Sequence, residues 1–237
     1  MDYVAFQRAR RAEIEERIAA ACAASGRTPD EILLVAVSKT VGIEEVAAAR
    51  EAGYAAFAEN RPQELKRKLA GAADHPVLAD ARWDMIGHLQ TNKVKDVVGR
   101  VALIHSVDTV HLAQAIDAQA AKLGIRMPVL MEVNIAGEES KSGFDPAAAR
   151  EGLDAIASLG NLDLEGLMGM APAHDPEAAR RAFSDLRELR DTLATASGLP
   201  LRELSCGMSD DFALAIEEGS TIIRLGRTVF DPAYVLQ

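Results

Sequence analysis

A lysine directly after an apolar segment is the first feature of this sequence that suggests chemistry. Residues 33–40, LLVAVSKT, run from buried-type side chains into Ser38 and Lys39. Apolar surroundings and nearby cations favour the neutral form of a lysine amine, which attacks a carbonyl and forms a Schiff base. The alternative is a lysine that extends to solvent at the end of a strand. Lys39 taken alone favours this second interpretation.

Two glycine-containing segments near the C-terminus are typical of loops that bind phosphate. The sequences SCGMS at 205–209 and RLGRT at 224–228 each follow a short apolar run. Gly207 and Gly226 permit close backbone approach, so free N–H groups there can bind an anion. Ordinary glycine turns are the alternative interpretation. The side chains that would add donors or charge are Ser209, Thr228 and Arg227.

Ser209 also has the position of a helix N-cap. The helix expected over 210–218 begins with Asp210 and Asp211, whose carboxylates stabilise its first turn. Because the same charges weaken the attraction of the helix for a phosphate, we expect both carboxylates to point away from a bound anion.

A Schiff-base lysine and a phosphate loop together indicate a ligand with both an aldehyde and a phosphate group. Pyridoxal 5′-phosphate (PLP) carries both on one compact ring, and a protein would hold and orient it. A sugar phosphate lyase that uses Lys39 and no cofactor fits the same pattern. The residues alone leave both alternatives open.

The elements that must position these residues alternate along the chain. Short runs rich in Val, Ile and Leu are followed by longer helical segments, which indicates parallel strands. Eight strands predict an α/β fold, a (β/α)8 TIM barrel with an extra N-terminal helix over 1–25 on its outer wall. A doubly wound open sheet is the alternative. The expected strands are 32–38, 55–58, 83–86, 102–106, 128–134, 162–168, 201–205 and 221–225, and the expected helices between them are 43–52, 62–70, 90–99, 109–123, 146–159, 176–197 and 210–218.

A barrel would bring the chemistry-bearing residues to one face. In this fold the site lies at the C-terminal ends of the strands, and the loops after strands seven and eight most often bind phosphate. Lys39 follows the first expected strand, and the two glycine segments follow the seventh and the eighth. We therefore expect the amine and the phosphate loops to face each other.

Composition and charge restrict the possible functions. The chain has 237 residues, 49% of them hydrophobic, which is enough for a large core in one domain over 1–237. A net charge of −10 argues against nucleic acid and anionic membranes as partners. Two cysteines without metal-ligand spacing, no signal peptide and no long apolar run predict a cytoplasmic protein. The five histidines are scattered, which predicts no metal site, and His105 is interpreted as a surface or strand-end residue.

Seven ordered segments after the first helix are specific as a set. They are AVSKT (36–40), FAENRPQE (57–64), WDMIGHLQTNK (83–93), SVDT (106–109), VNIAGEESKSGF (133–144), GLMGMAP (166–172) and LSCGMSDDFALAIEEGSTIIRLGRTVF (204–230). With these segments the chain resembles the pyridoxal phosphate homeostasis proteins, the YggS/PROSC group. Their fold is related to the barrel domain of alanine racemase.

The resemblance implies that the chain binds PLP and that Lys39 carries it as an internal aldimine. It places Arg224 beside the pyridine nitrogen, where a cation keeps that nitrogen unprotonated and damps carbanion chemistry. It places Ser209 and the backbone at Gly226 and Arg227 around the phosphate. The other residues that it places along the pocket are Asn60, His88, Asn134 and Met168.

A few positions depart from the family pattern. Ala58 stands where glycine is usual and Arg61 where an aromatic is usual, which can alter the rim of the pocket or the exchange rate. Cys206 replaces a usual methionine, and Asp231 stands where glycine is common. Lys141 either meets the ligand from a loop or is solvated.

The resemblance implies a protein that holds PLP reversibly, acts in intracellular PLP (vitamin B6) homeostasis and delivers PLP to PLP-dependent apo-enzymes. A PLP-dependent amino acid racemase is the alternative. In alanine racemases a second catalytic base comes from a C-terminal domain of a partner chain, and we expect no such domain in a chain that stops at Gln237. Two-sided proton transfer needs two positioned bases, and the residues suggest only Lys39. We therefore expect a monomer with no catalytic residue and no turnover beyond side reactions.

Overall fold

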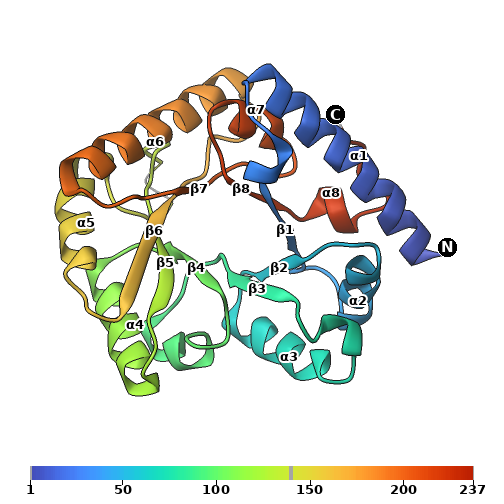
Figure 1. Cartoon of the computed structure of the whole chain (residues 1–237), viewed down its shortest axis with the longest axis horizontal. Coiled ribbons are helices and arrows are strands. Elements are labelled where there is room, and N and C mark those ends of the chain that lie inside the picture. Colours follow the sequence, from blue (N-terminus) through green and yellow to red (C-terminus); the bar gives the residue numbers. More distant parts are fainter. Residues whose placement is uncertain (1, 139–140, 237) are drawn as a thin grey trace.

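Eight parallel strands form a closed barrel in the computed structural model, which describes residues 2–138 and 141–236. The strands follow one another around the barrel in chain order, and β8 pairs with β1 to close it (Figure 1). The predicted TIM barrel is therefore confirmed, and the doubly wound alternative is wrong. The strands are β1 (Leu33–Val37), β2 (Ala56–Glu59), β3 (Arg82–Met85), β4 (Leu103–Val107), β5 (Met127–Glu132), β6 (Leu162–Met168), β7 (Glu203–Ser205) and β8 (Ile222–Leu225).

Helices surround the strands on the outside of the barrel, as Figure 1 shows. Gly124 and Gly198 end two of them in the left-handed conformation, which glycine adopts without strain. The α-helices are α1 (Tyr3–Ala24), α2 (Ile43–Glu51), α3 (Pro62–Ala72), α4 (Val110–Leu123), α5 (Ala149–Ala157), α6 (Pro176–Ser197), α7 (Phe212–Glu217) and α8 (Arg227–Phe230). Short 3-10 helices are η1 (Pro29–Glu31), η2 (Pro76–Leu78), η3 (Thr91–Asp96) and η4 (Pro146–Ala148).

Three helical segments differ from the sequence prediction. The helix expected over 90–99 is only the 3-10 helix η3, whose Thr, Asn and Asp residues have low helix propensity. The helix expected from 210 begins at Phe212 with Asp211 at the N-cap position, so Ser209 does not cap it. The short helix α8, directly after Gly226, was not predicted.

The apolar core has two parts that the strands separate. A large cluster joins the outward-facing strand residues to the helices, as with Ala36, Phe57 and Ile104. A smaller cluster draws on inward-facing residues of several strands, including Val35, Ala58 and Met168. This division follows from the two-residue period of a strand, which sends alternate side chains to opposite faces.

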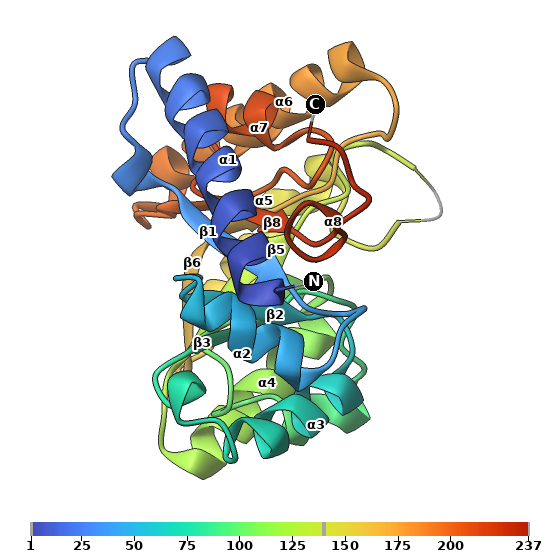
Figure 2. The same cartoon turned by 90° about the vertical axis from the view of Figure 1, so that its right-hand side faces the viewer.

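Helix α1 lies on the outer wall and contacts the last part of the chain. Figure 2 shows α1 running past β1 with α8 beside it. Gln7 Nε2 donates to Val229 O at 3.0 Å, and Arg10 Nη1 donates to Thr228 O at 3.0 Å. Arg10 Nη2 also donates to Tyr234 O at 2.9 Å. The N-terminal helix therefore holds the backbone of α8 in addition to covering the barrel.

Candidate functional site

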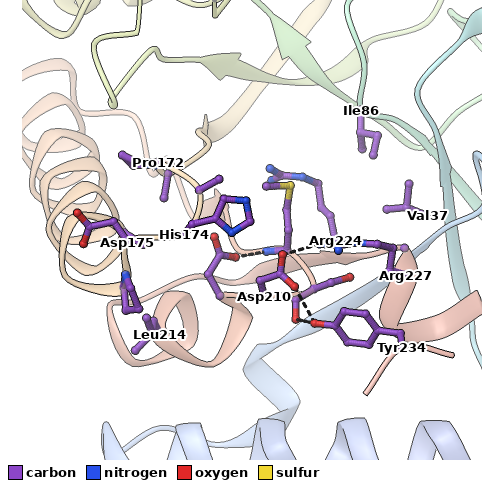
Figure 3. Close-up of a pocket in the computed structure, with 18 of the residues that line it drawn as sticks. Val37, Ile86, Pro172, His174, Asp175, Asp210, Leu214, Arg224, Arg227 and Tyr234 are labelled. Carbon is purple, nitrogen blue, oxygen red and sulfur yellow. Dashed lines mark hydrogen bonds and ion pairs between the residues drawn. The ribbon is translucent and has the colours of Figure 1, made fainter. Parts of the chain in front are cut away.

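A cavity of about 800 Å³ opens beside the C-terminal end of β1. Its wall combines the segments after β1 and β6, the segment between β7 and α7, and the segment from β8 to the C-terminal end (Figure 3). The predicted site residues that line it are Lys39, Ser209, Arg224, Gly226 and Arg227. Five predicted residues from three distant parts of the sequence are thus brought to one cavity.

Lys39 enters the cavity from the end of β1 with an exposed side chain. The preceding residue, Ser38, is fully buried, and its N–H donates to Ala58 O at 3.0 Å. The apolar surroundings expected from the sequence therefore enclose the backbone before Lys39 and not its amine. The amine stays accessible to a ligand in the cavity.

Arg224 is a buried guanidinium in the cavity wall, with 5% of its surface exposed. Its Nη1 donates to Ser205 Oγ at 2.6 Å, and its Nη2 donates to Gly169 O at 3.3 Å. Burial lowers the pKa of Arg224, and the nearby Glu132 opposes that shift. Because neither recorded partner carries a negative charge, the charge of Arg224 is available to a ligand.

Behind Arg224 a chain of polar side chains crosses the barrel interior. Ser205 Oγ lies 2.9 Å from His105 Nδ1, and His105 Nε2 lies 3.2 Å from Asp84 Oδ2. Burial lowers the pKa of His105, so its neutral ring accepts a hydrogen bond from Ser205 and donates one to Asp84. Arg82 Nε donates to Asp84 at 3.0 Å. Of the two alternatives expected for His105, a surface or a strand-end residue, the surface position is wrong, because the ring is fully buried in β4 and contacts the Ser205 hydroxyl that accepts from Arg224.

The segments that follow β7 and β8 carry the predicted phosphate-binding residues. Ser209 Oγ accepts the N–H of Thr228 at 3.2 Å, which leaves the serine O–H free to donate. The Thr228 hydroxyl is buried without a hydrogen-bond partner among the described residues. The N–H groups of Gly226 and Arg227 precede the first intrahelical bond of α8. These segments therefore offer hydroxyl and backbone donors.

The charge of Arg227 is engaged by neighbouring side chains. Its guanidinium forms an ion pair with Asp210 and lies 5.4 Å from the centre of the Tyr234 ring, and the Tyr234 hydroxyl donates to Asp210 Oδ1 at 2.8 Å (Figure 3). Burial alone would raise the pKa of Asp210, but Tyr234 and Arg227 together lower it. Asp211 accepts the N–H of Met208 at 2.6 Å. Arg227 thus presents mainly its backbone to an anion.

Four predicted pocket residues do not line this cavity. His88 bonds to Asp108 at 2.8 Å on the rim, and Met168 is buried in the small cluster inside the barrel. Asn134 Nδ2 donates to Glu138 O at 2.9 Å. Asn60 follows β2, and its backbone lies so close to Gly87 that a Cβ added at Gly87 would be 2.2 Å from Asn60 O. These residues surround neighbouring strand ends, and their placement along a ligand stays a prediction.

Glu132 is a buried carboxyl that the sequence analysis missed. It ends β5 with 4% of its surface exposed. Burial raises its pKa to about 7, the charge of Asp108 adds to the shift, and Arg224 opposes it. The signal in the sequence is an acidic residue at the end of an apolar strand, PVLME.

The departures from the family pattern have different surroundings. Ala58 is buried in the barrel interior, so its methyl group occupies core space. Arg61 is exposed at the N-cap position of α3. Lys141 is exposed, and its N–H donates to Glu138 O at 3.0 Å. The segment 133–144 includes residues 139 and 140, which lie outside the described part of the chain.

Among residues 2–138 and 141–236, no group of three or more His, Cys, Asp or Glu side chains has the arrangement of a metal site. No helix within these ranges is long and apolar enough to span a bilayer.

Comparison with known proteins defines the class of this barrel and its site. A model of the family "Alanine racemase, N-terminal domain" matches residues 11–232. The sequence is 42% identical over 222 residues to the pyridoxal phosphate homeostasis protein of Aquifex aeolicus (strain VF5), across 93% of this chain and 96% of that protein. The chain belongs to the pyridoxal phosphate homeostasis protein family, as its motifs predict.

Solved structures agree with this assignment. PipY of Synechococcus elongatus PCC7942, solved with PLP bound, is 35% identical with a TM-score of 0.80, over 92% of this chain and 99% of that chain. Alanine racemase of Clostridium difficile 630 is 15% identical with a TM-score of 0.70, over 84% of this chain and 55% of that chain. The second match concerns the fold alone, and it confirms the predicted relation to the alanine racemase barrel.

Proposed function

We propose that this protein holds PLP as a Schiff base on Lys39 and acts in intracellular PLP homeostasis and delivery. Two findings support the proposal: the relative from Aquifex aeolicus is named a pyridoxal phosphate homeostasis protein, and the structure of PipY has PLP bound. The proposal takes residues 1–237 as one PLP-binding domain, in a monomeric cytoplasmic protein. PLP-dependent apo-enzymes are the proposed recipients.

The shared cavity carries this proposal. An accessible amine, a buried guanidinium and a hydroxyl from Lys39, Arg224 and Ser209 line one space of about 800 Å³, within the range of small-ligand sites. An aldehyde, a ring nitrogen and a phosphate need partners of these three kinds.

The chemistry of capture follows from the amine. Lys39 would supply the amine and PLP the aldehyde for a Schiff base, whose formation releases one water, its oxygen from the aldehyde and its hydrogens from the amine. Ser209 and the backbone at Gly226 and Arg227 bind the phosphate, which orients the ring before this step. Water reverses the reaction, so an accessible amine suits a protein that releases its ligand.

Arg224 limits what the bound ligand can do. A guanidinium beside the pyridine nitrogen disfavours protonation of that nitrogen and weakens the ring as an electron sink. Its hydrogen bond to Ser205, with His105 behind, fixes its orientation. We therefore propose that the protein holds PLP without steady turnover of amino acids.

An absorbance titration tests the covalent assignment. Purified protein with PLP should develop a Schiff-base band, and Lys39→Ala should lose it while the fold is retained by circular dichroism. Borohydride reduction and peptide mapping should find the adduct on Lys39. A full band in Lys39→Ala, or an adduct on another lysine, would refute the assignment.

Transfer and turnover measurements test the biological part. Loaded protein should restore activity to a PLP-dependent apo-enzyme in proportion to the PLP that it releases. Incubation with L-alanine should produce no steady racemisation above that of free PLP. Sustained racemisation at many turnovers per site would instead support the enzyme alternative.

A further inference from the structure

A second lysine, Lys68, is buried in the barrel wall and contacts the backbone that precedes Lys39. Lys68 in α3 has 2% of its side chain exposed, and Glu59 at the end of β2 has none. Lys68 Nζ donates to Glu59 Oε1 and to the backbone oxygen of Ser38. The ion pair therefore reaches the peptide unit that leads directly into Lys39.

Every polar group of Ser38 is bonded to this wall. Its N–H donates to Ala58 O at 3.0 Å, and its Oγ donates to Glu59 Oε1 at 2.7 Å. Its carbonyl oxygen accepts from Lys68 and from the N–H of Val41, the latter at 3.1 Å. The side chain of Lys39, by contrast, is exposed. The flexible amine thus starts from a fixed backbone anchor, and the anchor depends on two buried charges.

Stability alone does not explain this buried pair. Removing two charges from water is costly, and a packed apolar pair of similar volume is often as stable or more stable. One carboxylate oxygen, Glu59 Oε2, has no hydrogen-bond partner among the described residues, which adds to the cost. An apolar pair would remove one of the two donors, Lys68 Nζ and the N–H of Val41, that bond the carbonyl oxygen of Ser38.

Burial also separates the roles of the two lysines. Burial lowers the pKa of Lys68, and its contact with Glu59 opposes that shift. With its amine inside the wall and bonded to two oxygens, Lys68 has no access to an aldehyde in the cavity. The cavity-lining residues include Lys39 but not Lys68.

We propose that Lys68 and Glu59 are positioning residues for Lys39, which fix the Ser38 peptide so that the amine meets the aldehyde of PLP at the right place. This inference rests on the proposed function. Displacing a reacting group by about 1 Å costs on the order of a hundredfold in rate. Loosening the anchor should therefore slow Schiff-base formation and leave binding of the phosphate and ring intact.

Two variants test the anchor. Lys68→Met removes the donor, and the double variant Glu59→Gln/Lys68→Met also removes the unpaired carboxylate, so it folds even if the single variant does not. The matched control is Arg67→Met, which changes the residue before Lys68 on α3. Arg67 forms an exposed ion pair with Glu64. All proteins are compared by circular dichroism and thermal unfolding before any ligand is added.

The first measurement needs no ligand. Amide hydrogen exchange of peptides covering 38–41 should become about tenfold faster in the double variant, because Ser38 loses its anchor. Peptides covering β8 should exchange as in the wild type. Arg67→Met should leave both regions unchanged.

The second measurement separates covalent capture from binding. The rate of Schiff-base formation with PLP should fall about tenfold or more in the double variant. Affinity for pyridoxine 5′-phosphate, which has no aldehyde, should stay within about twofold of the wild type. A uniform loss of both would indicate a purely structural role for the pair and would overturn the inference.

The two proposals fail in different ways. If borohydride trapping in the wild type finds no adduct on Lys39, the proposed function fails. If the wild type is trapped on Lys39 and the double variant forms its Schiff base at the same rate, only the positioning role is refuted. Unchanged exchange over 38–41 would refute it as well.

Discussion

The two sides of the cavity hold their ligand-facing groups by different means. On the amine side, a buried Lys–Glu pair inside the barrel wall fixes the backbone before Lys39. On the anion side, Gln7 and Arg10 from the outer helix α1 hold the carbonyl oxygens of Val229 and Thr228. One side is thus built from groups that titrate and the other from an amide and a guanidinium.

This difference shows that the barrel and helix α1 order different parts of the cavity wall. The end of β1 leads to Lys39, the proposed reactive group, and the Lys68–Glu59 pair lies inside the barrel wall beside that strand end. The segment from β8 onward lies at the end of the chain and has its last helix, α8, only four residues long. A helix this short has marginal stability without tertiary contacts, and α1 supplies such contacts to α8.

The largest effect should come from breaking the α1 contacts. Arg10→Met removes two charge-assisted hydrogen bonds and leaves the carbonyl oxygens of Thr228 and Tyr234 without their donor. We expect a loss of roughly 3 kcal/mol or more in the free energy of unfolding, measured in urea, and weaker binding of PLP. The exposed Arg8→Met is the control. Wild-type stability in Arg10→Met would mean that α1 merely covers the wall.

The next prediction tests whether the stability of the protein depends on the protonation of a carboxyl group at a strand end. Glu132, at the end of β5, has its pKa raised to about 7 by burial, with Asp108 adding to the shift. Because the folded pKa lies above the unfolded value near 4.5, this carboxyl favours the folded state fully below about pH 4.5 and loses that contribution as pH rises through about 7.

Glu132→Gln should remove this pH dependence. Relative to the wild type, the variant should gain up to about 3 kcal/mol of unfolding free energy between pH 4.5 and pH 8, since one pKa unit corresponds to about 1.4 kcal/mol. Urea unfolding at both pH values measures the gain, with the exposed Glu151→Gln as control. Parallel pH profiles for variant and wild type would show that Glu132 does not titrate in this range.

The sequence predicted the barrel because its strands and helices alternate with clear periods. The strand residues of β1, β6 and β8 match the expected ranges within one residue. The segment over 90–99 failed because helix propensity there is weak and a short connection suffices. Boundaries set by local capping, as at Asp211, need the path of the backbone, which one sequence does not contain.

A place in the cavity was predictable for residues that lie within a few positions after a strand, as with Lys39 and Ser209. It was not predictable where a residue acts through tertiary packing. Lys68 was missed although α3 buries Pro62, Leu65 and Lys68, a three-residue spacing that places the lysine on the inner face. Its partner Glu59 comes from another element, so the pair exists only in the folded chain.

Gly226→Ala should separate the contribution of the segment after β8 to PLP binding from its contribution to stability. Gly226 has φ −103°, and an added Cβ would lie 3.5 Å from Val37 O, an ordinary contact. We expect no loss of unfolding free energy, but about tenfold weaker binding of PLP, because the methyl group would obstruct the proposed approach of the phosphate to the backbone. Gly160→Ala, in open space, is the control. Unchanged affinity, measured by absorbance titration, would place the phosphate elsewhere.

The smallest effect concerns the exposed pair between Arg227 and Asp210, whose side chains are 61% and 54% exposed. Asp210→Asn should change the unfolding free energy by less than about 1 kcal/mol, because exposed ion pairs contribute little. It should nevertheless strengthen binding of pyridoxine 5′-phosphate by about two- to threefold at low salt, since the guanidinium loses its competing carboxylate. The gain should vanish at high salt, and Glu217→Gln, which disrupts the exposed pair with Arg180, should show no gain. A loss of affinity in Asp210→Asn would instead mean that Asp210 orders the anion side through Tyr234, so that this side too depends on a titratable group.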